Sequence, residues 1–510
     1  MSVERPDALP VSEPSSSNPL LIRLHETLIS CSKSIESGDF RQSDTLVSEL
    51  VSLLNSISDS VVLDPDNEDS KKNAFEVLSE IHRYICSSSL DQAVVDALSF
   101  ELPKAVAKFA GVSNKCLEIV DSVIDWLITA CNPRDMLSIL CEALDSPSMM
   151  FKFPSYFAPL LRGLSKVFLS IQRRHFEQVK VAVPVILNVL KAVSSESEDE
   201  DSDSEDLFDR AIGIANSIKA VCIKLEGRVN KSLRALLGLF VLQIMALFSI
   251  SVKEKVSSCL PLVLQLSQFL PYCGLSYLGS IIGCDVDTIF SVVLAEGGDD
   301  YVSHFSYVKH GASLAVIWGH ISNEVVQAAE EDLSIVKDEL RSNQAKRWQA
   351  VGMLKHIFSC VNLSWELKKY AIDFLLCITD GNISQKCNDE PMDCSSYIPN
   401  LFTALQAVQM VIMYTSDAVL RRNAFDAFKR VLADIPTSSR FDIIKALITN
   451  SSSPSMTAIL LDLVKEEMRK EIFQKAESKS CQSASCWSTG VLEFVELVLR
   501  PPKGGPPFPS

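Results

Sequence analysis

Cysteine and histidine are the residue types in this chain that could bind a metal ion. The 510 residues include 15 cysteines and seven histidines, and no two cysteines have the C-x-x-C spacing of a common zinc site. The nearest cysteine pairs, Cys387/Cys394 and Cys481/Cys486, have no histidine beside them. His304 and His310 begin and end the aromatic sequence HFSYVKH, where we interpret them as core or surface residues. The sequence therefore predicts no metal site.

Motifs for catalysis or nucleotide binding are also missing from the sequence. It has no G-x-S-x-G, H-E-x-x-H, P-loop or G-x-G-x-x-G pattern. The Gly297-Gly298-Asp299-Asp300 turn is better explained as a connection between helices than as a phosphate-binding loop. Acidic pairs are frequent, but they fall on polar helix faces. We therefore predict that the protein is not an enzyme and has neither a cofactor nor a small-molecule substrate.

One acidic segment has a composition suited to regulation. Residues 194–206, SSESEDEDSDSED, are all acidic or serine, so the sequence predicts a solvated, disordered loop. Ser195, Ser197 and Ser202 each have an acidic residue three positions later, the pattern read by an acidophilic kinase such as casein kinase II. Two interpretations stay open: a phosphorylated regulatory loop, or an insertion that only increases solubility.

The composition favours an acidic helical protein from a reducing compartment. Hydrophobic residues make up 47% of the chain and glycine is scarce, with 18 residues. The net charge of −16 argues against a nonspecific nucleic-acid-binding protein, which needs a basic surface. Cysteines such as Cys141, Cys222, Cys360 and Cys377 lie in apolar helical runs, as is typical of buried free thiols. The N-terminal residues contain no apolar signal core, so we expect the nucleus, the cytoplasm or both.

Helices must position any residues that bind a partner. In LRRNAFDAFKRVLADIP, Phe425, Phe428 and Leu432 recur every three or four residues, so they line one face of a helix and are expected to be buried. Pro436 ends this helix, because the residue before a proline is disfavoured in helical geometry. The apolar spacing resumes in SSRFDIIKALI, and two such helices form a hairpin. Without a strict sequence period, we predict an all-α, HEAT/armadillo-like α-solenoid of divergent helical hairpins.

Leu233–Val252 is an apolar segment nearly long enough to span a bilayer. It contains Arg234 and Gln243 and has no aromatic belt at its ends. We interpret it as a buried central helix rather than a transmembrane helix, and we predict no membrane partner.

Shifts in composition divide the chain into segments. They are a disordered leader at 1–17, N-terminal helical repeats at 18–193, the acidic serine-rich disordered loop at 194–206, central helical repeats at 207–385, C-terminal helical repeats at 386–500 and a Pro/Gly-rich tail at 501–510.

Several segments resemble the glomulin family. They are LRRNAFDAFKRVLADIP, SSRFDIIKALI and DFLLCITDG, and the terminal VLRPPKGGPPFP resembles the plant branch of that family. The resemblance implies a non-catalytic scaffold that inhibits cullin-RING (SCF) ubiquitin ligases, since family members bind the RING-box subunit and block docking of the E2 enzyme. For the plant branch it also implies a role in auxin-linked lateral root formation. Family members continue beyond this terminal sequence, so a C-terminally truncated form is expected.

The resemblance places the contact with the RING-box subunit and its cullin in the C-terminal half. Within 417–449 we predict that basic side chains bind this partner, namely Arg421, Arg422, Lys429, Arg430, Arg440 and Lys445. Acidic residues are interspersed with them, so ordinary solvated helix faces remain an alternative. A HEAT/armadillo-type transport or assembly adaptor is a second possible function, because an acidic solenoid suits basic cargo.

Overall fold

The structure is a computed structural model of the whole chain. It describes residues 18–87, 90–145, 153–196, 202–251, 256–297, 299–380, 395–451 and 453–477. Every regular element in these ranges is a helix, which confirms the predicted all-α class. The chain divides into two compact units, Met1–Leu233 and Arg234–Ser510, which we call unit 1 and unit 2. The predicted leader at 1–17 and tail at 501–510 lie outside the described residues.

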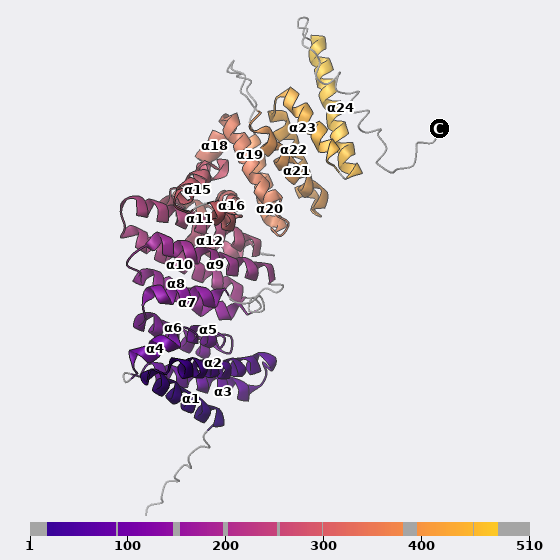
Figure 1. Cartoon of the computed structure of the whole chain (residues 1–510). Coiled ribbons are helices and arrows are strands. Elements are labelled where there is room, and N and C mark those ends of the chain that lie inside the picture. Colours follow the sequence, from indigo (N-terminus) through magenta and orange to yellow (C-terminus); the bar gives the residue numbers. More distant parts are fainter. Residues whose placement is uncertain are drawn as a thin grey trace, which may run out of the picture. The chain divides into compact units, whose positions relative to one another are not determined.

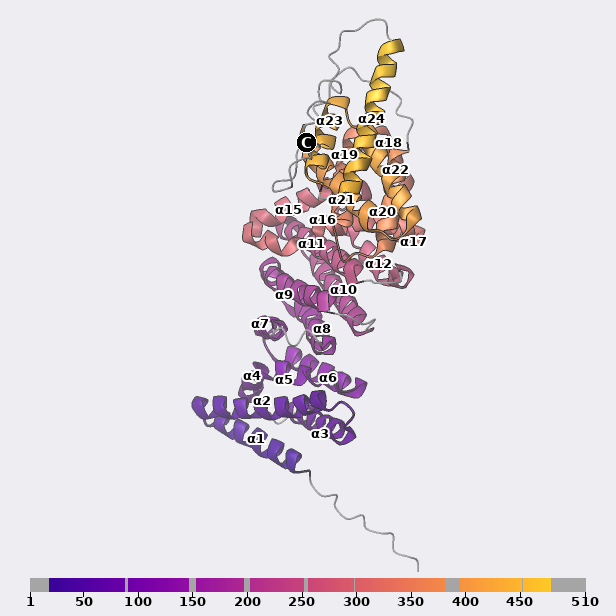
Figure 2. The ribbon, with the colours of Figure 1, turned by 90° about the vertical axis from the view of Figure 1, so that its right-hand side faces the viewer.

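Unit 1 is a series of antiparallel helices stacked in successive layers (Figures 1 and 2). The helices are α1 (Pro19–Glu36), α2 (Phe40–Leu63), α3 (Glu68–Ile85), α4 (Gln92–Ser99), α5 (Leu102–Ala107), α6 (Asn114–Ala130), α7 (Pro133–Leu144), α8 (Pro154–Ser170), α9 (His175–Glu196) and α10 (Ser202–Ile223). Short polar side chains begin many of them: Asn67 accepts from the N–H of Ser70, and Ser113 from that of Cys116. Local capping and apolar spacing therefore account for the individual helices.

Helix α8 packs against α6, α7 and α10 at the centre of unit 1. Phe157 and Phe168 are fully buried on it. Arg162 forms ion pairs with Asp121 (3.3 Å) and Asp125 (3.1 Å) of α6. Apolar burial and this ion-pair network together fix α8 on its neighbours.

The acidic segment 194–206 differs from its predicted form. Helix α9 continues to Glu196 and α10 begins at Ser202, so only residues 197–201 are left outside the described helices. The hydroxyl of Ser194 donates to the carbonyl of Leu190 (2.6 Å), which lets a polar residue continue the helix. The predicted disorder of residues 197–201 lies outside the described residues.

This segment connects two helices of the same unit. Helix α10 packs against both α8 and α9, and the division of the chain lies at Leu233, inside α11 (Gly227–Ser251). The break that we predicted between the N-terminal and central repeats at 194–206 is therefore not a boundary between compact units.

The helices of unit 2 follow α11 in a second stacked series (Figure 1). They are η2 (Val256–Cys259), α12 (Leu260–Ser267), α13 (Leu270–Cys273), α14 (Tyr277–Ile282), α15 (Cys284–Gly297), η3 (Asp299–Phe305), α16 (Val308–Ile321), α17 (Asn323–Ala328), α18 (Leu333–Ser342), α19 (Gln344–Phe358), α20 (Trp365–Thr379), α21 (Ile398–Tyr414), α22 (Ala418–Asp434), α23 (Thr437–Thr449) and α24 (Pro454–Glu477).

Helix α11 is the apolar segment that the sequence predicted to be buried. Both α2 and α11 are long and apolar enough to cross a membrane, but 89% of the apolar window of α11 is buried inside the protein, against 39% for α2. In unit 2, α11 packs on α16: Trp318 donates to Ser249 (3.0 Å), and Gln243 accepts from the N–H of Tyr307 (3.0 Å). These contacts are those of a helix in the core of a helical stack.

The hairpin predicted from LRRNAFDAFKRVLADIP and SSRFDIIKALI consists of α22 and α23. Phe428 is buried as predicted, with an exposed fraction of 1%. Phe425 is only half-buried, because its ring lies under the ammonium group of Lys429 (4.8 Å) instead of inside the core. The prediction that both aromatic rings are buried is therefore wrong for Phe425.

Candidate functional site

Two neighbouring hairpins of unit 2, α19–α20 and α21–α22, are held in register. The side chain of Asn423 donates to the carboxylate of Asp373 (3.5 Å). Seven residues further on, Arg430 forms an ion pair with Asp380 (2.9 Å). Both contacts join residues 50 positions apart, so α20 and α22 run side by side in the same direction. The same offset places Trp365, the first residue of α20, at the level of position 415, in the turn between α21 and α22.

Exposed apolar side chains gather at this end of the two hairpins. We define the apolar edge as Val361, Trp365, Met410, Tyr414 and Val419, with exposed fractions of 89%, 42%, 46%, 67% and 55%. Met410 and Tyr414 are one helical turn apart at the end of α21, and Val419 follows in the first turn of α22. Single exposed apolar residues are normal on a protein surface, but a cluster with two large aromatic rings is typical of a binding surface.

Arg421 and Arg422 lie beside the apolar edge, as the fourth and fifth residues of α22. Both are exposed. Arg421 donates to the carbonyl of Thr415 (2.5 Å), which holds its guanidinium next to the turn. Arg422 has no ion pair with a described residue, so its charge is available to a partner. The structure therefore brings these two predicted partner-binding residues together with apolar surface that the sequence analysis did not identify.

The other four predicted cations do not join this surface. Lys429 pairs with Asp426 (3.1 Å), and Arg430 with Asp380. Arg440 is largely buried, where it pairs with Glu467 of α24 and donates to the carbonyl of Ile435. Lys445 is half-buried on α23.

These four cations lie away from the apolar edge because of their positions along α22 and α23. Lys429 and Arg430 occur about two turns after Arg422 on α22, and Arg440 holds α24 on α23. These residues are committed to contacts within the protein, so we do not include them in the proposed surface.

Burial shifts the pKa of several thiol and imidazole groups far from neutral pH. Burial raises the pKa of the Cys141 thiol to about 12 and that of Cys31 to about 11, so both stay protonated and unreactive. Burial lowers the pKa of His310 to about 3, a shift to which the nearby His356 and Lys368 also contribute. Among the described residues, His, Cys, Asp and Glu side chains form no group of three that could hold a metal ion.

Known proteins resemble this chain along most of its length. Residues 39–218 and 385–505 match the model of a family described as an uncharacterised protein family, YAP/Alf4/glomulin. The chain is 50% identical over 487 residues to Aberrant root formation protein 4 of Arabidopsis thaliana, an alignment that covers 95% of this chain and 76% of that protein. The chain belongs to the YAP/Alf4/glomulin family. The resemblance to the glomulin family that the sequence segments indicated is thereby confirmed.

Two solved structures also resemble this glomulin-family chain. One is a circular tandem repeat protein with novel repeat topology and enhanced subunit contact surfaces: it is 12% identical, and the match covers 84% of this chain and 97% of that chain with a TM-score of 0.27. The other is the TSC2 N-terminus: it is 11% identical, and the match covers 87% of this chain and 100% of that chain with a TM-score of 0.19. Neither superposition says anything about function.

The predicted phosphorylation sites lie in unit 1, away from the apolar edge in sequence. Ser195 is in the last turn of α9, where its hydroxyl donates to the carbonyl of Ala192 (2.8 Å). Ser202 is the first residue of α10, and Ser197 lies outside the described residues. Phosphorylation of these serines stays a prediction.

The sequence carries only a weak signal for the apolar edge. Trp365 follows Ser364, whose hydroxyl accepts from the N–H of Leu367 and starts α20. Tyr414 likewise ends α21 just before the polar turn at 415–417. A large aromatic residue at the boundary of a helix, next to polar turn residues, is the pattern that could have pointed to this surface. The register of the hairpins was needed to bring the members together.

Proposed function

We propose that this chain is a non-catalytic inhibitor of cullin-RING (SCF) ubiquitin ligases, which binds the RING-box subunit and its cullin and blocks docking of the E2 enzyme. Membership of the YAP/Alf4/glomulin family supports a protein-interaction scaffold. The name of its 50% identical relative, Aberrant root formation protein 4, supports a role in root formation. We extend the proposal to auxin-linked lateral root formation, with the nucleus and the cytoplasm as the sites of action.

The apolar edge is the observation that carries the binding part of this proposal. Trp365 and Tyr414 are the aromatic residue types that contribute most to protein interfaces, because they bury a large area with little loss of side-chain entropy. Trp365 begins α20, and Tyr414 ends α21 just before α22; contacts between α20 and α22 hold these two helices in register. A preorganised apolar surface of this kind loses little conformational freedom when a partner binds.

Arg421 and Arg422 are suited to the polar rim of the interface. Exposed cations at a rim mainly raise the rate of association and select the partner, while they contribute little to the final affinity. We therefore expect the apolar edge to determine the lifetime of the complex and the two arginines to determine its dependence on salt.

The inhibitory mechanism is steric competition. The inhibitor and the E2 enzyme bind overlapping surfaces of the RING-box subunit, so the ligase binds one or the other. No catalytic group is needed, and a rigid helical stack provides the required bulk. Competition of this kind predicts that excess E2 restores ubiquitin transfer.

The direct test is E2-dependent formation of ubiquitin chains by a purified RING-box/cullin complex, titrated with this protein. We expect the rate to fall as the protein is added and to recover when E2 is added in excess. Inhibition that E2 does not relieve would indicate a different binding site. The absence of both inhibition and binding to the RING-box/cullin complex would reject the proposal.

Matched variants locate the surface. Tyr414→Ser combined with Val419→Ser should weaken binding at least about tenfold, since two exposed apolar contacts are lost. Arg422→Glu should lower the association rate most strongly at low salt. Arg469→Glu, an exposed charge reversal on α24, is the control and should leave both unchanged. Equal binding by all of these variants would exclude the apolar edge as the contact.

A further inference from the structure

Besides the apolar edge of unit 2, a charged surface lies in unit 1 and has no part in the proposed function. It is formed by the connections from α8 to α9 and from α10 to α11. We define the basic edge as its five exposed cations, Arg173, Arg174, Lys224, Arg228 and Lys231. A concentrated basic surface is unexpected on a chain whose net charge is −16.

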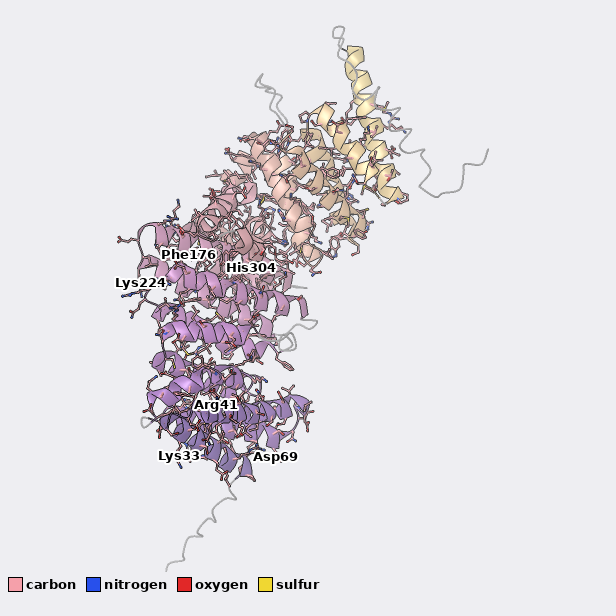
Figure 3. The ribbon with its side chains drawn as sticks, in the orientation of Figure 1. Lys33, Arg41, Asp69, Phe176, Lys224 and His304 are labelled. Carbon is pink, nitrogen blue, oxygen red and sulfur yellow. The ribbon has the colours of Figure 1, made fainter. Side chains whose placement is uncertain are left out.

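The two connections are neighbours because α8 and α10 run side by side in register. The hydroxyls of Ser165 and Ser217 form a hydrogen bond (2.8 Å), and Ser165 also donates to the carbonyl of Gly213 (3.4 Å). Helix α8 ends at Ser170 and α10 at Ile223, five and six residues beyond this contact. Because each helical residue adds about 1.5 Å, the C-terminal ends of α8 and α10 lie at nearly the same distance beyond this hydrogen bond. Figure 3 shows Lys224 on the same side of unit 1 as Phe176, which lies in the first turn of α9.

Both connections are rigidly held. A ring nitrogen of His175 is hydrogen-bonded to the carbonyl of Ile171 (3.0 Å) across the first connection. The amide of Asn230 donates to the carbonyls of Cys222 (2.6 Å) and Leu225 (3.0 Å) across the second. Arg174 has a φ of +56°, a left-handed conformation that non-glycine residues rarely adopt. This conformation sets the direction in which the side chain of Arg174 leaves the turn.

Most cations of the basic edge have no acidic partner among the residues that the structure describes. Arg173, Arg174, Lys224 and Lys231 form no ion pair with any residue in the described part of the chain. The acidic side chains closest in sequence are Glu177 and Glu226, both of which are exposed.

The acidic segment 194–206 lies at the opposite end of the same hairpin. Helix α9 runs for 22 residues from His175, beside the basic edge, to Glu196 within this segment, a length of about 33 Å. The described end of α9 at Glu196 is therefore remote from the basic edge.

We propose that the basic edge binds an acidic, extended segment of another protein. Complementary charge would attract and orient such a segment. Two exposed apolar side chains, Ile223 (67% exposed) and Val229 (48% exposed), lie among the cations and suit a ligand that has aliphatic as well as acidic side chains. A nucleic-acid backbone would gain nothing from these apolar residues, and the net charge of the chain repels long polyanions.

The test measures the binding of a fluorescent 15-residue peptide in which glutamate and aspartate alternate with leucine, using the full chain. We expect binding that weakens as salt increases. Combining Arg173→Glu with Lys224→Glu should weaken it about tenfold or more, because two attractive contacts become repulsive. The neutral pair Arg173→Gln and Lys224→Gln should have an intermediate effect.

Lys33→Glu combined with Arg41→Glu is the matched control, since it makes the same change in net charge on α1 and α2 (Figure 3). Its affinity for the peptide should equal that of the unaltered protein, and thermal melting should show that all variants are folded. Equal losses in the control and the edge variants would overturn the proposal, as would unchanged binding by both edge variants. Tighter binding of a single-stranded oligonucleotide to the edge would also overturn it. So would salt-sensitive self-association that the edge variants abolish, because a second copy would then be the occupant.

Discussion

Arg347 and Asp434 form a buried ion pair in unit 2, although 87 residues separate them in the sequence. Two parallel hydrogen bonds, of 2.8 and 2.6 Å, join the guanidinium of Arg347 to the carboxylate. Trp348 also donates to this carboxylate (3.0 Å), and Gln344 donates to the backbone carbonyl of Asp434 (2.8 Å). The last residue of α22 is thereby fixed to the first turn of α19, within the helices that carry the apolar edge.

Loss of one partner of this pair should destabilise unit 2 strongly. Asp434→Ala leaves the guanidinium of Arg347 buried without its counter-charge, for which we expect a loss of about 3–5 kcal/mol in the free energy of unfolding. Chemical denaturation measures the change. Arg430→Ala, which breaks the exposed pair with Asp380, should cost less than about 1 kcal/mol and serves as the control. Similar values for the two variants would mean that the pair with Arg347 is not buried.

The two aromatic residues of α22 should differ in their contributions to stability. Phe428→Ala removes a fully buried ring and should cost about 3–5 kcal/mol. Phe425→Ala should cost about 1 kcal/mol or less, because that ring is half-exposed and contacts Lys429. Urea denaturation of both variants is the measurement. A larger loss for Phe425→Ala than for Phe428→Ala would mean that α22 turns Phe425, and not Phe428, towards the core.

Close packing of α11 against α16 makes Gly311 sensitive to any side chain. A methyl group at this position would lie 1.8 Å from the backbone carbonyl oxygen of Leu242, which cannot rotate away. We expect Gly311→Ala to destabilise unit 2 by about 3 kcal/mol or more.

Gly213→Ala in α10 is the matched control, since a methyl group there meets no atom within 4 Å. Alanine is the better helix former, so this variant should be unchanged or up to about 1 kcal/mol more stable. Thermal melting of both variants compares their changes in stability. The comparison separates the clash between α11 and α16 from the effect that replacing any helical glycine by alanine has on stability. A neutral Gly311→Ala would show that α11 and α16 are further apart than described.

Unit 2 should lose stability in mild acid because of its buried histidines. Burial lowers the pKa of His310 to about 3 and that of His356 to about 4, and lysines near His356 add to its shift. The pKa in the unfolded chain is about 6.5. Below this value the unfolded state binds protons that the folded state does not, so stability falls as the pH decreases from about 6.5 towards 4. The slope approaches about 1.4 kcal/mol per pH unit for each such histidine.

Denaturation at a series of pH values tests this dependence. His310→Leu removes one of the titrating groups, so its stability should fall less steeply than that of the unaltered protein between pH 6.5 and 5. Replacing the exposed His304 in the same way should leave the slope unchanged. Parallel curves for all three proteins would show that His310 is accessible to protons in the folded state.

The fold class and many helix boundaries followed from local features of the sequence. Apolar residues every three or four positions predicted α22 and α23, and Pro436 marked the place where one helix gives way to the next. The family resemblance also rested on short contiguous segments. These predictions succeeded because helical periodicity, capping and the effect of proline depend on residues that are close together in the chain.

The tertiary structure alone decided which side chains are exposed and which of them lie together on the surface. Sequence reasoning counted Arg440 among the partner-binding cations, yet Arg440 pairs with Glu467. Nothing in the local sequence showed that Asp434 is buried against Arg347. The apolar edge arises because residues about 50 positions apart become neighbours in adjacent hairpins. Such contacts depend on how one helix is placed against another, so the periodicity within each helix could not predict which charges would be neutralised or which apolar side chains would remain exposed.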